Sequence, residues 1–308
     1  MPESAPEISV CLCTYKRPDK LSDCLKSLVK QSFSHPFEVI VTDNDSHRSG
    51  EKVVYEFNEV FQIRGIHISY LVEPVQNISL ARNRCVQAAR GNLVAFIDDD
   101  ERASSHWLET LYQILLETDA DGVWGPVIPD IPESFPEWMR RSKLFHRPIL
   151  KDKSAMQSSS LRTGNAIIKR SLLGMRSGPF RGKFGRTGGE DSDLFTRLQK
   201  KKFKFVWAAH AEVIELIEEK RRHLCWHVKR GYRGGWAYSL KLVENNGWIG
   251  GFCLSTGRIF PASLRSALLF VKNLKNPRAA FYQLAGELSG HLGKIGYFLN
   301  VKVEEYRK

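Results

Sequence analysis

The chain has 308 residues, 42% of them apolar and 26% charged, which is enough for a substantial core and typical of a globular protein. Its formal charge of +12 favours anionic partners such as nucleotides, nucleic acid or an anionic membrane surface. The sequence contains no Cys-x-x-Cys pair, no secretory signal pattern and no apolar run of about eighteen residues. These features argue against a disulfide framework and a spanning helix, and we expect a cytoplasmic protein.

The first 130 residues alternate between apolar strand patterns and helical spacings. The predicted strands cover residues 8–13, 37–42, 66–72, 93–97 and 122–128. The predicted helices cover residues 21–29, 53–57, 79–90 with Gly91 as the C-cap, and 107–115. Such alternation indicates an α/β fold with a doubly wound, mostly parallel sheet, in which ligands bind at the carboxyl ends of the strands.

The remainder of the chain is less regular. Residues 129–160 are rich in proline and polar residues, which predicts a long irregular connection. We then expect, in order, a strand over 164–169, a glycine-rich loop over 178–189, a helix through Leu194 and Leu198, and strands over 203–207 and 213–217. After Pro261 the pattern predicts basic amphipathic helices, so we expect a main domain over 1–240 and a helical appendage over 241–308.

Four consecutive acids at residues 98–101 follow the fourth predicted strand. Acids this close raise one another's pKa, which favours a bound cation that neutralises them. Oxygen ligands suit Mg²⁺ or Mn²⁺, and these ions usually also hold substrate phosphates. Asp98 and Asp100 form an Asp-x-Asp pair and are the candidate metal ligands. The alternative is a solvated acidic turn before a helix, with Ser104 or Ser105 as its N-cap.

Two more polar clusters, residues 14–17 and 43–46, follow the first two predicted strands. Asp43 is placed to bind the base or ribose of a nucleotide, although an Asx-turn or a helix N-cap explains it equally well. Arg82 falls early in the helix predicted over 79–90, where it is within reach of a phosphate or a base. A solvated surface arginine is the alternative at that position.

A second acidic signal, Glu190-Asp191, follows two glycines at the expected start of a helix. The helix dipole favours carboxylates there, and capping explains one of them. Two acids after a flexible loop favour a general base that removes a proton from an acceptor hydroxyl. Further along, residues 226–236 are aromatic and basic, and both a phosphate clamp and an ordinary basic helix fit this stretch.

In order and spacing, these elements resemble the family 2 glycosyltransferases, which have the nucleotide-diphospho-sugar transferase (GT-A) fold, over about residues 7–240. The matching segments are residues 10–18, 39–46, 81–83, 96–101 and 188–191. Within the family the chain is most similar to bacterial exopolysaccharide enzymes of the succinoglycan-biosynthesis type. The resemblance implies a catalytic domain over 1–240, with a nucleotide-sugar-binding half over 1–130 and an acceptor-binding half over 131–240.

The resemblance also implies an inverting, metal-dependent hexosyltransferase that uses a UDP-sugar. The nucleotide-sugar-binding residues it implies are Thr14, Tyr15, Arg17, Asp43, Arg82, Asp98 and Asp99. Asp98 and Asp100 are the implied ligands of Mn²⁺ or Mg²⁺, Asp191 the general base, and Glu190 the residue that positions the acceptor. The Gln-x-x-Arg-Trp motif of processive members is absent, so we expect the addition of a single sugar.

The basic helices after Pro261 suggest peripheral contact with an anionic membrane, at its inner face, and a lipid-linked oligosaccharide as the acceptor. Packing on the catalytic domain and a dimer interface are the alternatives for these helices.

A rival function is a non-catalytic nucleotide- or nucleic-acid-binding protein that uses the basic C-terminal region. That function explains the charge but not the two acidic motifs, so we expect no nucleic acid. A nucleotidyltransferase or a dinucleotide oxidoreductase needs a glycine-rich loop after the first strand, where residues 14–18 contain no glycine.

Overall fold

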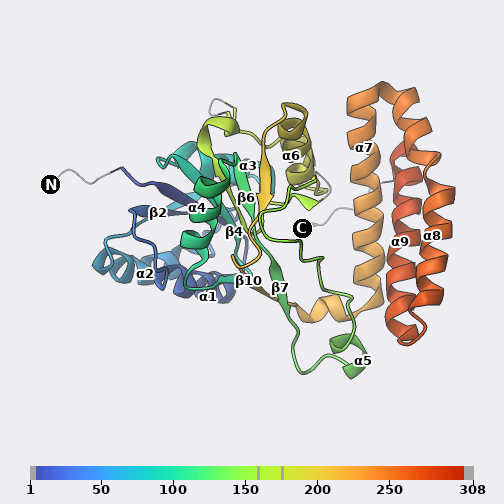
Figure 1. Cartoon of the computed structure of the whole chain (residues 1–308), viewed down its shortest axis with the longest axis horizontal. Coiled ribbons are helices and arrows are strands. Elements are labelled where there is room, and N and C mark those ends of the chain that lie inside the picture. Colours follow the sequence, from blue (N-terminus) through green and yellow to red (C-terminus); the bar gives the residue numbers. More distant parts are fainter. Residues whose placement is uncertain (1–4, 158–159, 175–176, 302–308) are drawn as a thin grey trace. The chain divides into compact units, whose positions relative to one another are not determined.

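The computed structural model describes residues 5–157, 160–174 and 177–301 (Figure 1). Their contacts divide the chain into two compact units, which are treated separately below. The described residues of the first unit come from Met1–Ile128, Arg147–Gly185 and Glu190–Glu215. Those of the second unit come from Pro129–His146, Arg186–Gly189 and Leu216–Lys308.

The first unit alternates strands and helices, as the sequence predicts. Its strands are β1 (Ile8–Thr14), β2 (Phe37–Asp43), β3 (His67–Val72), β4 (Leu93–Asp98), β5 (Glu101–Ala103), β6 (Gly122–Trp124), β8 (Ala166–Lys169) and β9 (Phe205–Trp207). Its helices are α1 (Pro18–Val29), α2 (Glu51–Ile63), α3 (Ile78–Ala88), α4 (Trp107–Thr118) and α6 (Glu190–Lys200), with 3₁₀ turns at Arg170–Leu173 and Gly182–Phe184. The chain passes between the units within β7 (Val127–Asp130) and within β10 (Val213–Leu216).

The main sheet has seven strands in the order β3-β2-β1-β4-β8-β6-β9. β8 runs antiparallel to β4 and β6, and the other neighbouring pairs are parallel, which confirms the predicted mostly parallel sheet. In the register of this sheet, Thr14 lies opposite Asp43, and Cys13 lies opposite Asp98. The ends of β1, β2 and β4, which carry the three predicted polar clusters, therefore meet at one edge.

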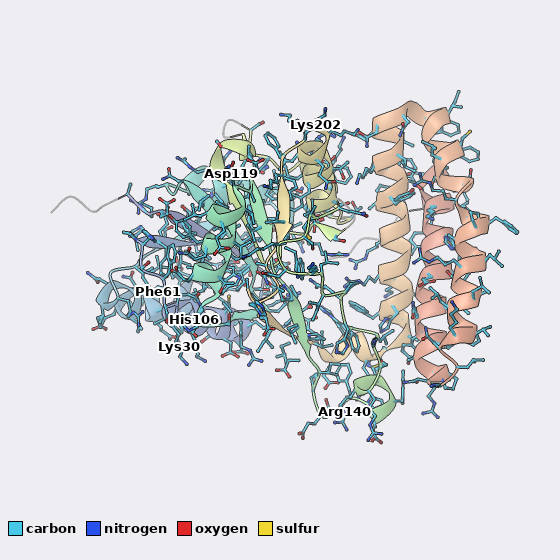
Figure 2. All side chains as sticks on the ribbon, in the orientation of Figure 1. Lys30, Phe61, His106, Asp119, Arg140 and Lys202 are labelled. Atoms are coloured by element: carbon cyan, nitrogen blue, oxygen red, sulfur yellow. The ribbon has the colours of Figure 1, made fainter. Side chains whose placement is uncertain are left out.

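Both faces of the sheet are covered, and the central strands β1 and β2 are accordingly buried along almost their whole length. All seven positions of β2 are buried. One face packs against α1, α2 and α4, whose inward side chains include Leu25, Trp107 and the fully buried Phe61 labelled in Figure 2. The other face packs against α3 and α6.

The single strand predicted over 122–128 is wrong, because the chain breaks at Gly125-Pro126 into β6 and β7. A Cβ on Gly125 would lie 2.1 Å from the carbonyl oxygen of Ala211, so only glycine fits this close approach. Proline cannot donate to a sheet ladder. After this break, β7 joins a second sheet of order β5-β10-β7.

Two predicted helix ends are also corrected. The helix predicted to stop at Gly91 ends at Ala88, with extended Ala89 as its C-cap. The backbone N–H of Arg90 donates to Glu38 Oε1 at 2.8 Å, and this bond draws the chain out of the helix. The N-cap of α4 is His106 instead of either serine considered for it. Figure 2 labels His106 at the start of α4 and Asp119 at its left-handed C-cap.

The second unit is mainly helical. It contains α5 (Glu137–Arg140), which interrupts the connection predicted as irregular, a 3₁₀ turn at Glu219–Arg222, and the helices α7 (Leu224–Thr256), α8 (Ile259–Lys272) and α9 (Pro277–Phe298). The expected boundary between residues 240 and 241 lies within α7, and the second compact unit includes the chain from Leu216 onwards. The division into a catalytic domain and an appendage stays a prediction. No helix in the described part of the chain combines the length and the apolar character needed to cross a membrane.

Candidate active site

The acidic run lies where β4 ends, and its four carboxylates have very different exposures. The side chain of Asp98 is 45% exposed, whereas those of Asp99 and Asp100 are 7% and 9% exposed. Glu101 is fully buried and its Oε2 accepts a hydrogen bond from the backbone N–H of Asp98 at 3.0 Å. Asp98 is therefore the most open carboxylate of the run.

Residues after β1 face the buried acids, as the shared sheet edge predicts. Thr14 Oγ1 donates to Asp99 Oδ2 at 2.9 Å. Arg17 Nη1 lies 3.2 Å from Asp99 Oδ1 and 3.4 Å from Asp100 Oδ2, and Lys20 Nζ lies 3.7 Å from the same Asp100 oxygen. The two basic side chains partly neutralise the acidic run within the protein.

Burial dominates the titration of these acids. It raises the pKa of Asp99 to about 7, although the nearby Arg17 acts to lower it. Burial also raises the pKa of Asp100, with the charge of Asp98 adding to the effect. For the fully buried Glu101, burial and then Asp98 hold the pKa well above its usual range. Asp99, Asp100 and Glu101 therefore keep their protons to a higher pH than exposed carboxyl groups do.

Asp99 links the stability of the fold to pH. Its pKa is about 7 in the folded chain, against about 3.9 for an exposed aspartate. The folded state therefore keeps a proton that the unfolded state loses, and this stabilisation is lost as the pH rises through the folded pKa. We expect the free energy of unfolding to fall between about pH 5 and about pH 8, and to fall less in Asp99→Asn.

Urea unfolding at the two pH values measures this difference. Asp119→Asn is the control, because the side chain of Asp119 is 98% exposed and its left-handed backbone suits asparagine. An unchanged pH dependence in Asp99→Asn would contradict the titration of Asp99.

Arg82, on α3, joins the two acidic motifs. Its Nη2 lies 3.3 Å from Asp98 Oδ1, and its Nη1 donates to Glu190 Oε1. The Arg82 side chain is only 10% exposed. Burial acts to lower its pKa, but the carboxylates of Glu190, Asp98 and Asp191 outweigh that effect and raise it. The interpretation of Arg82 as a solvated surface residue is therefore wrong.

Glu190 is the first residue of α6, as predicted, and is buried. Burial raises its pKa, and Arg82 acts against that rise. Since a guanidinium stays protonated in proteins and donates directly to Glu190, the geometry supports the ionised pair. Among the described residues, no donor lies within hydrogen-bond distance of the other oxygen, Glu190 Oε2.

Asp191, the next residue of α6, is partly exposed, and its Oδ1 accepts a hydrogen bond from the backbone N–H of Ser192 at 2.6 Å. The glycines before the helix have φ values of +83° at Gly188 and +96° at Gly189. Side chains other than glycine rarely adopt this region, so the double glycine is required by the turn that presents the two acids.

Asp43 has partners within the chain. It is fully buried, and its Oδ2 accepts from the backbone N–H of Gly50 at 2.6 Å and from the Tyr70 hydroxyl at 2.8 Å. Its Oδ1 accepts from the backbone N–H of Asp45 at 3.0 Å, which is the Asx-turn considered as the alternative. Nearer the acids, Tyr15 is partly exposed in the loop after β1. Nucleotide binding by Asp43 and Tyr15 stays a prediction.

The donor chemistry at the end of β4 fits a hard divalent cation, since it consists of carboxylate oxygens. Within the described ranges, no group of three or more His, Cys, Asp or Glu side chains is arranged to hold a metal ion by itself. Mg²⁺ is commonly bound by one or two carboxylates together with substrate phosphates. Asp98 and Asp100 therefore fit an ion that a diphosphate also ligates.

Sequence reasoning missed Gly164 and Lys20. A Cβ on Gly164 would lie 2.7 Å from Glu101 Oε1 and 3.1 Å from Asp98 Oδ2, so glycine leaves the room that these carboxylates occupy. The helical spacing of α1 contains a signal for Lys20, since it lies three residues after Arg17 and shares its face. No local pattern marks Gly164, because its neighbours come from a distant strand.

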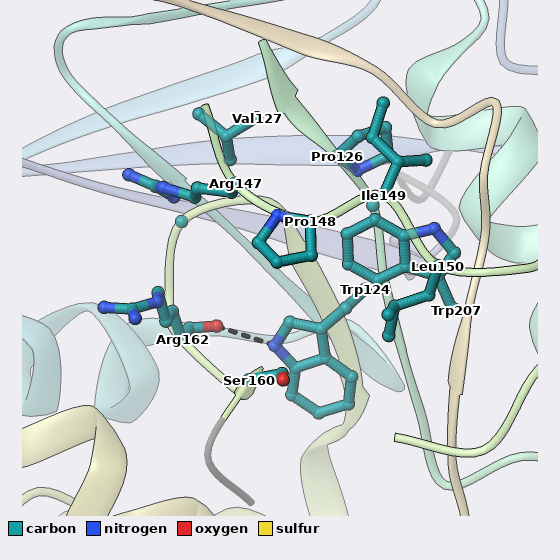
Figure 3. Close-up of a pocket in the computed structure, with 12 residues that line it drawn as sticks. Trp124, Pro126, Val127, Arg147, Pro148, Ile149, Leu150, Ser160, Arg162 and Trp207 are labelled. Atoms are coloured by element: carbon teal, nitrogen blue, oxygen red, sulfur yellow. Dashed lines mark hydrogen bonds between the residues drawn. The ribbon is translucent and has the colours of Figure 1, made fainter. Parts of the chain in front are cut away.

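Gly164 also lines a pocket of about 230 Å³ in the first unit (Figure 3). Trp124 and Trp207 form part of its wall, and Arg147 and Arg162 also line it. Trp124 is held in place by a hydrogen bond from its Nε1 to the carbonyl oxygen of Arg162 at 2.6 Å. Gly164 is thus a lining residue of this pocket, and a Cβ built on it would approach both Glu101 and Asp98.

Comparison with known proteins identifies related sequences. The sequence model described as glycosyl transferase family 2 matches residues 9–175. The chain is 32% identical to the succinoglycan biosynthesis protein ExoM of Rhizobium meliloti (strain 1021), over 95% of both chains. This similarity extends over both compact units.

Solved structures share the fold at low sequence identity. A mannosyltransferase, PcManGT from Pyrobaculum calidifontis in complex with GDP-Man and Mn²⁺, has a TM-score of 0.64 and 14% identity, covering 98% of this chain and 89% of that one. S. aureus TarS 1-349 in complex with UDP-GlcNAc has a TM-score of 0.55 and 16% identity, covering 96% and 92%. With the sheet described above, these likenesses confirm the expected GT-A fold.

Proposed function

Because this chain belongs to glycosyltransferase family 2, we propose that it moves one hexose from a UDP-sugar to a saccharide acceptor, with inversion at the anomeric carbon. Its relative ExoM is named for succinoglycan biosynthesis, and fold neighbours bind UDP-GlcNAc or GDP-Man. A bacterial exopolysaccharide or surface polysaccharide is accordingly the proposed product. The absence of the Gln-x-x-Arg-Trp motif supports a single addition.

The observation that carries this proposal is the bridge made by Arg82. It contacts Asp98 from β4 and Glu190 from α6, two residues far apart in the sequence. An acidic group suited to a donor diphosphate and its metal thereby lies beside the start of the helix that carries the candidate base. A transferase needs this proximity, because donor and acceptor must react within one site.

Asp191 is the proposed general base. Its Oδ2 would take the proton of an acceptor hydroxyl while that oxygen attacks the anomeric carbon from the face opposite the departing UDP. An α-linked donor then gives a β-linked product. Glu190 Oε2, which lacks a donor among the described residues, is the proposed contact that positions the acceptor.

Thr14, Tyr15, Arg17, Asp43, Arg82, Asp98 and Asp99 are proposed to form the nucleotide-sugar site. Asp98 and Asp100 would hold Mn²⁺ or Mg²⁺ together with the donor diphosphate. A bound ion of this kind neutralises charge on the leaving group.

The pocket beside Gly164 is the proposed entrance for the acceptor sugar. Aromatic rings such as those of Trp124 and Trp207 suit the apolar faces of a saccharide, and the arginines can donate to its oxygens. We further propose that the acceptor is lipid-linked, so that the protein works in the cytoplasm at the inner face of the membrane. The excess of basic residues, with a net charge of +12, supports this placement.

Release of UDP from a panel of UDP-sugars, with Mn²⁺ and with EDTA, tests the transferase proposal. One donor is expected to turn over, and EDTA or Asp100→Asn is expected to lower its turnover about a hundredfold. Asp119→Asn, at an almost fully exposed position without a proposed role, should keep wild-type turnover. UDP binding is measured in the same samples by calorimetry.

Two outcomes would contradict the proposal. If neither UDP binding nor turnover occurs with Mn²⁺ present, the donor is not a UDP-sugar. If turnover is equal with Mn²⁺ and with EDTA, and Asp100→Asn behaves as Asp119→Asn does, the metal assignment is wrong.

A further inference from the structure

The second unit has an unusual distribution of residue sizes. Every buried residue of α7, α8 and α9 is glycine, serine or alanine. The residues buried at these helices are Gly235, Ser239, Gly251, Ser255, Ser266, Ala280, Ser289, Gly293 and Gly296. The inward positions of a helix bundle in water usually include large apolar side chains as well as small ones. The fully buried positions of these three helices are filled by small residues alone.

Close contact between backbones explains the small residues. A Cβ on Gly231 of α7 would lie 2.0 Å from the carbonyl oxygen of Gly286 on α9. One turn further along, a Cβ on Gly235 would lie 1.8 Å from the carbonyl oxygen of Gly290. Interfaces of this kind, in which small residues let helix backbones approach, are characteristic of helices that pack in a lipid environment.

Many of the large apolar side chains of these helices are exposed. On α8, Phe260 is 78% exposed, and Leu264, Leu268 and Val271 are more than half exposed. Their spacing of four, four and three residues places them on one face of the helix, whereas the buried Ser266 lies on the opposite side. On α9, the exposed residues Phe281, Leu288, Leu292 and Ile295 likewise share one face. Contiguous exposed apolar faces of this kind mark an interaction surface.

The charges around α8 distinguish an anionic membrane from a second copy of the chain as the partner of its exposed apolar side chains. Residues 245–286 contain five Lys or Arg and no Asp or Glu. The cations Arg265, Lys272 and Lys275 lie on or directly after α8 and are exposed. This surface combines apolar side chains with positive charges and carries no negative charge. Such a surface complements anionic phospholipid headgroups above an acyl region. It would repel a second copy of itself in a symmetric pairing.

We propose that the α8 face, defined by Phe260, Leu264, Leu268 and Val271, inserts into the surface of an anionic phospholipid bilayer. The apolar side chains enter the boundary of the acyl region, and Arg265, Lys272 and Lys275 contact the headgroups. The helices lie in the membrane surface, since none of those described is long and apolar enough to cross it. This docking does not depend on the transferase proposal.

Co-sedimentation of the full chain with phosphatidylglycerol and with phosphatidylcholine vesicles tests the docking. Wild-type protein is expected to bind the anionic vesicles and to be released by salt. Leu264→Asp/Leu268→Asp is expected to lower the partition coefficient about a hundredfold. Tyr55→Asp/Ile63→Asp is the matched control, since these α2 side chains are 81% and 78% exposed and lie in the first unit. Circular dichroism verifies the fold of each variant.

Three outcomes would overturn the docking. In the first, wild-type protein ignores phosphatidylglycerol vesicles at low salt. In the second, the α8 and α2 double variants lose binding equally. In the third, light scattering shows a dimer that the α8 double variant dissociates while no vesicle binding occurs, which makes the face an interface between copies. UDP binding, measured in the same samples, reports on the transferase proposal separately.

Discussion

Replacing Asp191 with asparagine is expected to lower kcat for sugar transfer about a thousandfold, while UDP binding stays within about twofold of wild type. Asparagine keeps the shape of the side chain and still accepts the Ser192 hydrogen bond, but it cannot take a proton. Asp191 is only partly buried at the first turn of α6, so the substitution should leave the fold intact. Steady-state kinetics with the active UDP-sugar, together with calorimetry of UDP binding, measures both quantities.

Asp119→Asn makes the same chemical change at a position without a proposed role and should retain wild-type kinetics. A fall in kcat of less than about tenfold in Asp191→Asn would remove it as the base, because general bases typically contribute at least about a hundredfold. Loss of UDP binding in Asp191→Asn would instead move this residue to the donor site.

The second large effect is expected on stability. Arg82→Met should lower the free energy of unfolding by about 3–5 kcal/mol, because it leaves the buried Glu190 carboxylate without its partner. Asp98 also loses the guanidinium of Arg82, but this loss lowers the free energy of unfolding less because the side chain of Asp98 is more exposed. Urea unfolding followed by circular dichroism measures the change.

The neighbouring residue Arg84 provides a matched control on the same helix. Its side chain is 47% exposed and lies 3.7 Å from Glu73, so Arg84→Met should cost less than about 1 kcal/mol. Adding Glu190→Gln to Arg82→Met should recover part of the lost stability, because the unpaired buried charge is then gone. If Arg82→Met and Arg84→Met lower the free energy of unfolding equally, the ion pair of Arg82 with Glu190 contributes no more than a surface ion pair.

If Arg82→Met lowers the stability as expected, one arginine explains how the fold holds its two acidic motifs together. The cost of burying Glu190 is offset by the charge of Arg82, and the same charge faces Asp98 where the donor diphosphate is proposed to lie.

Local patterns predicted most of the first unit. The apolar runs at 8–13 and 37–42 are strands because their residues are covered on both faces, and periodic spacing located α1 and α4. The wrong predictions lie where contacts between distant segments determine the backbone conformation. The break at Gly125 depends on the approach of Ala211, and the end of α3 depends on Glu38.

The sequence by itself determined which residues make up the candidate site, since acids after buried strands and at a helix start are visible in the order of residues. Only the tertiary structure decided their environment. It buried Asp99 and opened Asp98, joined Asp98 to Glu190 through Arg82, and gave Asp43 partners within the chain. It also turned the large apolar side chains of α8 outward, which helical spacing alone cannot establish. The physical reason is the same in each case: burial and pairing depend on residues brought together from distant segments, and periodicity reports only on neighbours.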